Sequence, residues 1–150
     1  MVGVTTSVTL RDVDLGDTAT HGSQLFELLR TLRPGLTHLE SDRFLAEGPR
    51  QGLRGVVALT PEGELAGLAL YRILSTSRGR IVFLDDLVTK PDVRSKGVGA
   101  ALLEEVEVRG RQTGCERMEL DSGTANEDAH RFYERHGMSA VALHFGKNLG

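Results

Sequence analysis

The 150-residue sequence has a single cysteine and no long apolar run. Because one cysteine cannot form a disulfide within the chain, Cys115 predicts a small, at least partly buried side chain and a reducing compartment. No apolar stretch approaches the roughly 18 residues that a membrane-spanning helix needs. The N-terminal residues also lack the basic and apolar segments of a secretion signal. We therefore expect a cytoplasmic protein that does not bind membranes.

The sequence also lacks an excess of positive charge. Its 18 lysines and arginines are outnumbered by 21 aspartates and glutamates, which gives a formal net charge of -3. A protein that binds the phosphate backbone of nucleic acids normally needs a basic surface, so we expect no nucleic-acid partner. The five histidines form no spacing typical of a metal site, since His130 and His136 fall on different faces of a helix. No GxSxG elbow is present, which argues against a serine hydrolase.

Apolar residues alternate with polar ones in several segments, which predicts strands, and recur three or four apart in others, which predicts helices. The expected elements are a strand at 8–13, helices at 17–33 and 38–47, a hairpin of strands at 56–59 and 65–74, a strand at 81–89, a helix at 97–113, a strand at 118–121, a helix from about 126 to 137 and a last strand at 140–147. Capping-box spacing joins Thr37 to Glu40, and Thr124 to Glu127. The order β-α-α-β-β-β-α-β-α-β predicts one α/β (α+β) domain over residues 1–150, with a mixed, mostly antiparallel sheet. It excludes a doubly wound sheet.

Gly97 and Gly99 stand at the start of a predicted helix, directly after a strand and a loop that contains Lys90, Arg94 and Lys96. Backbone amides at a helix N-terminus lack intrahelical partners, glycine permits close approach, and the helix dipole favours an anion. A pyrophosphate would suit this position. Taken alone, the two glycines are equally consistent with a tight turn into the helix. A nucleotide triphosphate site is disfavoured because the GxxxxGK[ST] pattern is absent.

The residues around these glycines carry a family resemblance. Residues 87–103, LVTKPDVRSKGVGAALL, resemble the signature of the GNAT acetyltransferases around their [Q/R]xxGx[G/A] loop. The resemblance implies that acetyl-CoA is the cosubstrate, that the loop amides bind its pyrophosphate, and that the preceding strand splays from its neighbour so that pantetheine pairs with its backbone. The implied cofactor-binding residues here are Leu87, Val88, Thr89, Arg94, Ser95, Lys96, Gly97, Val98, Gly99 and Ala100. Ser95 replaces a glycine that is common, but variable, in the motif.

A second segment supports the same family. Residues 126–138, NEDAHRFYERHGM, resemble the GNAT helix whose asparagine and tyrosine face the acyl-thioester. The resemblance implies that Asn126 and Tyr133 contact acetyl-CoA and that Tyr133 protonates the departing CoA thiolate. The runs 129–133 and 144–147 are also similar to small bacterial aminoalkylphosphonate acetyltransferases, whereas residues 85–87 resemble a segment of polyamine acetyltransferases. These similarities conflict, so the sequence does not select the acceptor.

Acetyl transfer to an amine needs a base, and two acids are well placed to supply it. Asp85 and Asp86 come near the end of the strand expected to bind pantetheine. Strand alternation sends their side chains to opposite faces, so only one would face the acceptor. The family resemblance implies that Asp85 acts as base through a water and that Asp86 binds the substrate cation, although a β-bulge would exchange these roles. Either acid could instead serve only to pair with an arginine.

Together these observations predict an N-acetyltransferase that moves the acetyl group of acetyl-CoA to a primary amine of a small molecule or peptide. The amine would attack directly in a ternary complex, with Tyr133, Asp85 and Asp86 as catalytic residues and without a metal. The family resemblance is also consistent with a homodimer. An alternative is a noncatalytic acyl-CoA-binding sensor on the same fold, which would bind acyl-CoA without releasing thiol. A third hypothesis, a small nucleotide-binding regulator, predicts competition by ATP or NAD at the loop.

Overall fold

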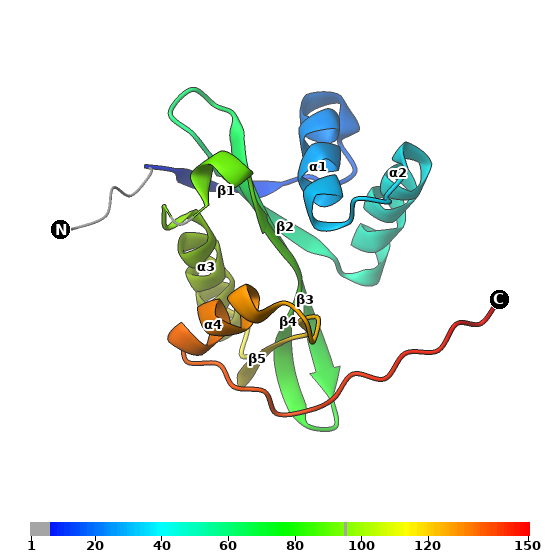
Figure 1. Ribbon diagram of the computed structural model, residues 1–150, viewed down its shortest axis with the longest axis vertical. Coiled ribbons are helices and arrows are strands. Elements are labelled where there is room, and N and C mark those ends of the chain that lie inside the picture. Colours follow the sequence, from blue (N-terminus) through cyan, green and yellow to red (C-terminus); the bar gives the residue numbers. More distant parts are fainter. Residues whose placement is uncertain (1–6, 95) are drawn as a thin grey trace. The chain divides into compact units, whose positions relative to one another are not determined.

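The computed structural model describes residues 7–94 and 96–150 (Figure 1), and these residues form two compact units. The first unit, residues 1–119, contains a sheet with helices on both of its faces. Its elements are β1 (Thr9–Val13), α1 (Thr18–Leu32), α2 (His38–Glu47), β2 (Arg54–Leu59), β3 (Leu65–Thr76), β4 (Gly79–Thr89), α3 (Val98–Gln112) and the start of β5 (Arg117–Leu120), with short 3-10 helices at Gly48–Gln51 and Pro91–Val93. The expected order of elements is therefore confirmed through β5.

The sheet follows the chain, with the strand order β1-β2-β3-β4-β5. The first three pairings are antiparallel, because tight turns return the chain beside the strand that it has just left. The chain reaches β5 through α3 instead, and β5 begins beside the start of β4, where the backbone N–H of Glu116 donates to the carbonyl of Arg80 at 2.8 Å. The predicted mixed, mostly antiparallel sheet is confirmed.

Helices α1 and α2 cover one face of this sheet. The apolar stripe of α1, which includes Leu25, Leu28 and Leu29, packs with Leu68 and Leu70 of β3 into a buried cluster. Local signals fix where both helices begin: the Asp17 carboxylate accepts from the backbone N–H of Ala19, and the predicted capping box before α2 is formed in both directions. The cap therefore sets where α1 begins, and the apolar stripe sets which side of the helix packs on the sheet.

Helix α3 lies against the opposite face (Figure 1). A glycine in β3 makes this possible, because a Cβ atom added to Gly67 would lie 2.9 Å from Leu102 Cδ1 and 3.2 Å from Val98 Cγ1. The buried side chains of Val98 and Leu102 fill that space. The close approach holds the first turn of α3 beside the part of β3 that pairs with the end of β4.

The second unit, residues 120–150, contains α4 (Glu127–Arg135). Its N-cap is Asn126, whose side chain accepts from the backbone N–H of Ala129 at 3.3 Å. The predicted capping box that starts at Thr124 is therefore wrong, since an asparagine two residues later performs the capping. None of the described helices of either unit is long and apolar enough to cross a membrane.

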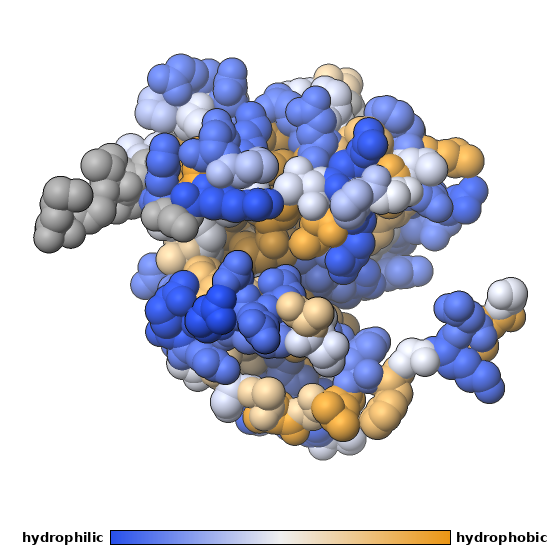
Figure 2. All heavy atoms as spheres, viewed as in Figure 1, coloured by the Kyte–Doolittle hydropathy of each residue, from blue (hydrophilic) through white to orange (hydrophobic). Residues whose placement is uncertain are grey.

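The expected last strand at 140–147 is also wrong, because residues 138–150 have no regular secondary structure. Alternation predicts which side chains could share a face, but a strand forms only where a second strand supplies hydrogen bonds, and within the second unit the described residues include no such partner. The alternating Val141, Leu143 and Phe145 are 71%, 78% and 87% exposed. Figure 2 shows apolar surface, coloured orange, along the C-terminal segment.

Candidate functional site

The predicted phosphate-binding loop leads directly into α3. Gly97 is the N-cap and has φ 86°, a left-handed conformation that side chains with a Cβ rarely adopt. No side chain of the described residues caps this helix, and its first turn contains no acidic residue. The first backbone amides of α3, those of Val98, Gly99 and Ala100, thus form an end suited to an anion. Arg94 and Lys96 are exposed beside it, and Ser95 lies outside the described residues.

The end of β4 runs past the reach of its neighbour β5. Because β5 has four residues and starts beside Arg80, it extends roughly 13 Å along β4 at 3.3 Å per residue. Leu87, Val88 and Thr89 lie farther along, where β3 pairs with one edge of β4. The described strands therefore leave the other edge of these three residues without a strand partner. That arrangement suits the pantetheine contact implied by the family resemblance.

A β-bulge in β4 changes the predicted placement of the two acids. Asp86 lies opposite Leu70, while Leu84 lies opposite Tyr71, so Asp85 is the extra residue of β4. Residues directly opposite each other in a sheet share a face, so Asp86 points to the face of Leu70, where α1 packs. The expectation that alternation separates the two acids is wrong, because the extra residue shifts the alternation by one.

Asp85 is held by an arginine on the same face. The Nε of Arg72 donates to both carboxylate oxygens of Asp85, at 3.3 and 3.2 Å. The two side chains are 22% and 21% exposed. Burial raises the pKa of Asp85, and the charge and hydrogen bond of Arg72 lower it, leaving the pKa above its ordinary value. Asp85 therefore forms one half of a compact ion pair.

Asp86 is more buried and more loosely paired. Its side chain is 15% exposed, and the nearest arginine atom of this ion pair, Nη2 of Arg33, lies 3.8 Å from Oδ1, too long for a hydrogen bond. Burial and, to a smaller extent, the neighbouring charge of Asp85 raise the pKa of Asp86 to about 6, outweighing the charges of Arg33 and Arg72, which lower it. A carboxylate with this pKa is ionised at neutral pH and can accept a proton, as a general base requires.

The second unit carries the other two predicted residues, Asn126 and Tyr133. Asn126 caps α4, so its side-chain oxygen is engaged with the backbone of its own helix. The half-buried Tyr133 lies in the same helix, where its ring packs edge-on against Phe132 with 5.2 Å between centroids. Their contact with acetyl-CoA remains a prediction.

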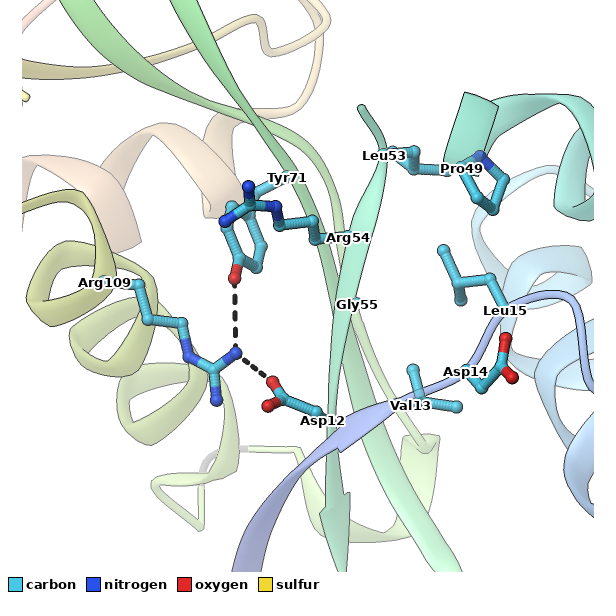
Figure 3. Close-up of a pocket in the computed structure, with 10 residues that line it drawn as sticks. All are labelled: Asp12, Val13, Asp14, Leu15, Pro49, Leu53, Arg54, Gly55, Tyr71 and Arg109. Atoms are coloured by element: carbon cyan, nitrogen blue, oxygen red, sulfur yellow. Dashed lines mark hydrogen bonds and ion pairs between the residues drawn. The ribbon is translucent and has the colours of Figure 1, made fainter. Parts of the chain in front are cut away.

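A separate charged cluster lies on the α3 face of the sheet, beside a cavity of about 300 Å³ (Figure 3). Arg109 of α3 is its centre. One nitrogen of Arg109 donates to Asp12 and to the Tyr71 hydroxyl, the latter at 3.2 Å, and Nε donates to Glu105 at 3.0 Å. Burial lowers the pKa of Arg109, but the hydrogen bonds with Tyr71, Asp12 and Glu105 outweigh it and raise the pKa above its ordinary value. Arg109 is therefore a permanent cation that ties α3 to β1 and β3.

The sequence interpretation missed Arg33 and Arg72, which pair with the two acids. A weak signal existed for Arg72, because an arginine within the otherwise apolar run of β3 needs an anionic partner. The sequence contains no comparable signal for Arg33, since a basic residue at the end of a helix is usual. Within residues 7–94 and 96–150, no cluster of three potential metal ligands occurs.

Known proteins are similar to this chain in sequence and in fold. The family model described as "Acetyltransferase (GNAT) family" matches residues 23–138, which confirms the resemblance noted in the sequence. Aminoalkylphosphonate N-acetyltransferase of Salmonella typhimurium is 38% identical over 66 residues, 44% of this chain and 43% of that protein. The chain spans about half the length of the curated relatives it matches.

Solved structures extend the similarity to most of the chain. An acetyltransferase from Trypanosoma brucei is 28% identical, with a TM-score of 0.75 over 95% of this chain and 100% of that one. An aminoglycoside N-acetyltransferase in complex with CoA is 21% identical, with a TM-score of 0.79 over 99% of each chain. The second of these similarities concerns the fold alone.

Proposed function

Because this chain belongs to the acetyltransferase (GNAT) family, we propose that it is an acetyl-CoA-dependent N-acetyltransferase that acts on a primary amine. The observation that carries the proposal is the end of α3: a left-handed glycine, no side-chain cap among the described residues and no acid in the first turn. Such an end binds an anion, and it lies where the family motif requires the pyrophosphate of CoA.

The residues present fit this cosubstrate. The amides of Gly97 to Ala100 would hold the pyrophosphate, with Arg94 and Lys96 adding positive charge. The backbone of Leu87 to Thr89 would pair with pantetheine along the edge of β4 that β5 does not reach. The complex of CoA with a protein of the same fold supports this assignment. When bound, acetyl-CoA supplies the acetyl group.

The reaction requires two proton transfers. As the amide C–N bond forms and the C–S bond breaks, the amine loses a proton and the CoA thiolate gains one. We assign the first proton to Asp86, because its pKa of about 6 lies closer to neutral pH than that of an ordinary aspartate. Asp85 is committed to Arg72. The resemblance to polyamine acetyltransferases implies that Asp85 is the base and that Asp86 binds the substrate cation. The bulge in β4 favours the exchange of these two roles.

Tyr133 is the proposed donor of the second proton, and Asn126 would contact the thioester beside it. The family motif at residues 126–138 supports both roles. The acceptor would be a small-molecule amine, a class that includes the substrates named for relatives, aminoalkylphosphonate, aminoglycoside and thialysine. A single domain over residues 1–150, a homodimer and a cytoplasmic location belong to the same proposal.

The proposal is tested by release of CoA thiol from acetyl-CoA with a panel of primary amines. We expect turnover with at least one amine and a loss of about 10²- to 10⁴-fold in Tyr133→Phe, the usual contribution of a general acid. CoA should still stabilise the Tyr133→Phe variant against heat. Saturable acyl-CoA binding without thiol release for any amine would favour the noncatalytic sensor, and competition by ATP or NAD would favour the nucleotide regulator.

A paired substitution tests the loop itself. Gly97→Val should lower CoA affinity by about 10- to 100-fold, because a side chain at this left-handed position displaces amides that bind a charged group. Gly52→Val is the control: its φ is also 86°, it lies in another turn, and an added Cβ meets nothing within 4 Å. Equal CoA affinity in the folded Gly97→Val protein and in Gly52→Val would show that the loop assignment is incorrect.

A further inference from the structure

Arg33 occupies an unusual position for an arginine that pairs with a buried acid. It is the C-cap residue of α1, and its backbone N–H donates to the carbonyl of Leu29 at 2.8 Å. Its side chain is 67% exposed, while that of its partner Asp86 is 15% exposed. The guanidinium of Arg33 is thus largely exposed to solvent while it lies beside Asp86, the proposed base.

The two arginines of this site differ in how firmly they are held. Arg72 is 22% exposed and donates to both oxygens of Asp85. Arg33 approaches Asp86 only to 3.8 Å, beyond the hydrogen-bonding range. A guanidinium has five N–H donors in a planar fork that matches carboxylate and phosphonate oxygens. Arg33 therefore keeps donors directed to solvent, beside the acid that would deprotonate the acceptor.

Building on the proposed acetyl transfer, we propose that Arg33 binds an anionic group of the acceptor, which is a short amine that carries a carboxylate or a phosphonate. The amine would face Asp86 while the anion takes the fork of Arg33. When the amine binds Oδ1 of Asp86 and the anion binds Nη2 of Arg33, with a hydrogen bond of about 2.8 Å at each end and 3.8 Å between the two protein atoms, the amine and the anion are at most roughly 9 Å apart. A short linker meets this condition.

The same geometry disfavours an acceptor with a second cation. A diamine that placed one ammonium at Asp86 would bring its other ammonium close to Arg33, and like charges at such short range repel. The ion pair between Arg72 and Asp85 is already balanced and supplies no spare negative charge. The acids alone would favour a polyamine, and it is Arg33 that changes this preference.

Four acceptors of similar length test the proposal: β-alanine, aminoethylphosphonate, propylamine and diaminopropane. The first two differ in the anion, the third has none, and the fourth has a cation in its place. We expect kcat/KM, measured by thiol release, to be at least about tenfold higher for one of the anionic amines than for propylamine, and lowest for diaminopropane. The ratio of kcat/KM for β-alanine to kcat/KM for aminoethylphosphonate shows whether Arg33 prefers a carboxylate or a phosphonate.

The variant Arg33→Gln should lower kcat/KM for the preferred anionic amine by about 10- to 100-fold, mainly through KM, because charge-assisted hydrogen bonds are lost. Its effect on propylamine should be clearly smaller, because only the influence of the Arg33 charge on the pKa of Asp86 is lost for an acceptor without an anion. Arg33→Lys keeps the charge but not the fork, so an intermediate loss is expected. The matched control is Arg30→Gln, which removes the same charge one turn earlier in α1 from a guanidinium that lies over the Phe26 ring. It should leave all four acceptors unchanged.

Calorimetric binding of the anionic amine to the CoA-saturated protein separates this inference from the proposed function. Turnover that is equal for all four amines and unchanged in Arg33→Gln would overturn the role of Arg33 while acetyl transfer stands. Arg33-dependent binding of the anionic amine without thiol release for any acceptor would overturn acetyl transfer while the role of Arg33 stands. Absence of both binding and turnover would overturn both.

Discussion

Two partly buried ionic groups lie on opposite faces of the same sheet, and they differ in how their charges are paired. On the α3 face, Arg109 donates to Asp12, Glu105 and the Tyr71 hydroxyl. On the α1 face, Asp86 is 15% exposed and has its Arg33 partner at 3.8 Å. The first group is tightly hydrogen-bonded, and the second is a desolvated charge with a distant counter-ion.

We interpret this difference as one between a structural role for Arg109 and the chemical role proposed for Asp86. Hydrogen bonds that match each charge make Arg109 a stable cation, because its charged form is favoured in the fold. Burial without close pairing raises the pKa of Asp86 toward neutrality, which costs folding free energy and agrees with the base that we propose. Substitutions in the two groups should therefore change activity and stability in opposite ways.

The largest expected effect is on turnover in Asp86→Asn. Loss of the proposed base should reduce kcat by about 10²- to 10⁴-fold, measured by thiol release at saturating acetyl-CoA and amine. Asp85→Asn is the comparison, and it should retain clearly more turnover because Asp85 serves mainly to hold Arg72. A larger loss of kcat in Asp85→Asn than in Asp86→Asn would return the role of base to Asp85.

The same Asp86→Asn substitution should stabilise the protein at neutral pH. The pKa of Asp86 is raised from 3.8 to about 6, so the folded state binds more protons than the unfolded state between these values, and stability falls as pH rises through this window. The whole pKa shift of Asp86 corresponds to a loss of at most about 3 kcal/mol in the free energy of unfolding. Urea unfolding should show the variant more stable than the parent at pH 7.5, with the gap closing toward pH 4. A variant that is less stable than the parent at pH 7.5 would show that Asp86 is well paired.

The smallest effect concerns Arg109→Met, which should destabilise the protein by about 1 to 2 kcal/mol and leave kcat within about threefold. The buried Tyr71 hydroxyl loses its donor, while the exposed Asp12 regains water. Arg111→Met is the control, since Arg111 is 74% exposed and pairs with Glu107 at 3.6 Å; we expect a change below about 0.5 kcal/mol. If Arg109→Met reduced kcat as strongly as Asp86→Asn, the division between the two groups would be wrong.

Local signals in the sequence were sufficient for most of the fold. The limits of α2 and the capping box at Thr37 follow from residues three apart, and the stripe of Leu25, Leu28 and Leu29 follows from helical spacing. Two predictions failed where the outcome depends on residues elsewhere. The segment at 140–147 alternates, but it forms no strand, and Asn126 competes successfully with Thr124 for the cap of α4.

The site was only partly predictable for the same reason. Motif spacing placed Gly97 at the start of α3 and both acids in β4. The bulge that brings Asp85 and Asp86 to one face depends on how β4 registers against β3, which alternation within one strand does not contain. The approach of Arg33 depends on how α1 packs on the sheet, so its role could be inferred only from the structure.

The pH dependence of kcat/KM tests the central claim, that the poorly paired acid on the α1 face is the base, most directly. The kcat/KM of the parent divided by that of Asp86→Asn, measured with the same amine so that titration of the acceptor cancels, should fall below pH 6, with a midpoint near the pKa of Asp86 and about a tenfold fall per pH unit beyond it. A ratio that does not change between pH 5 and 8 would contradict the account.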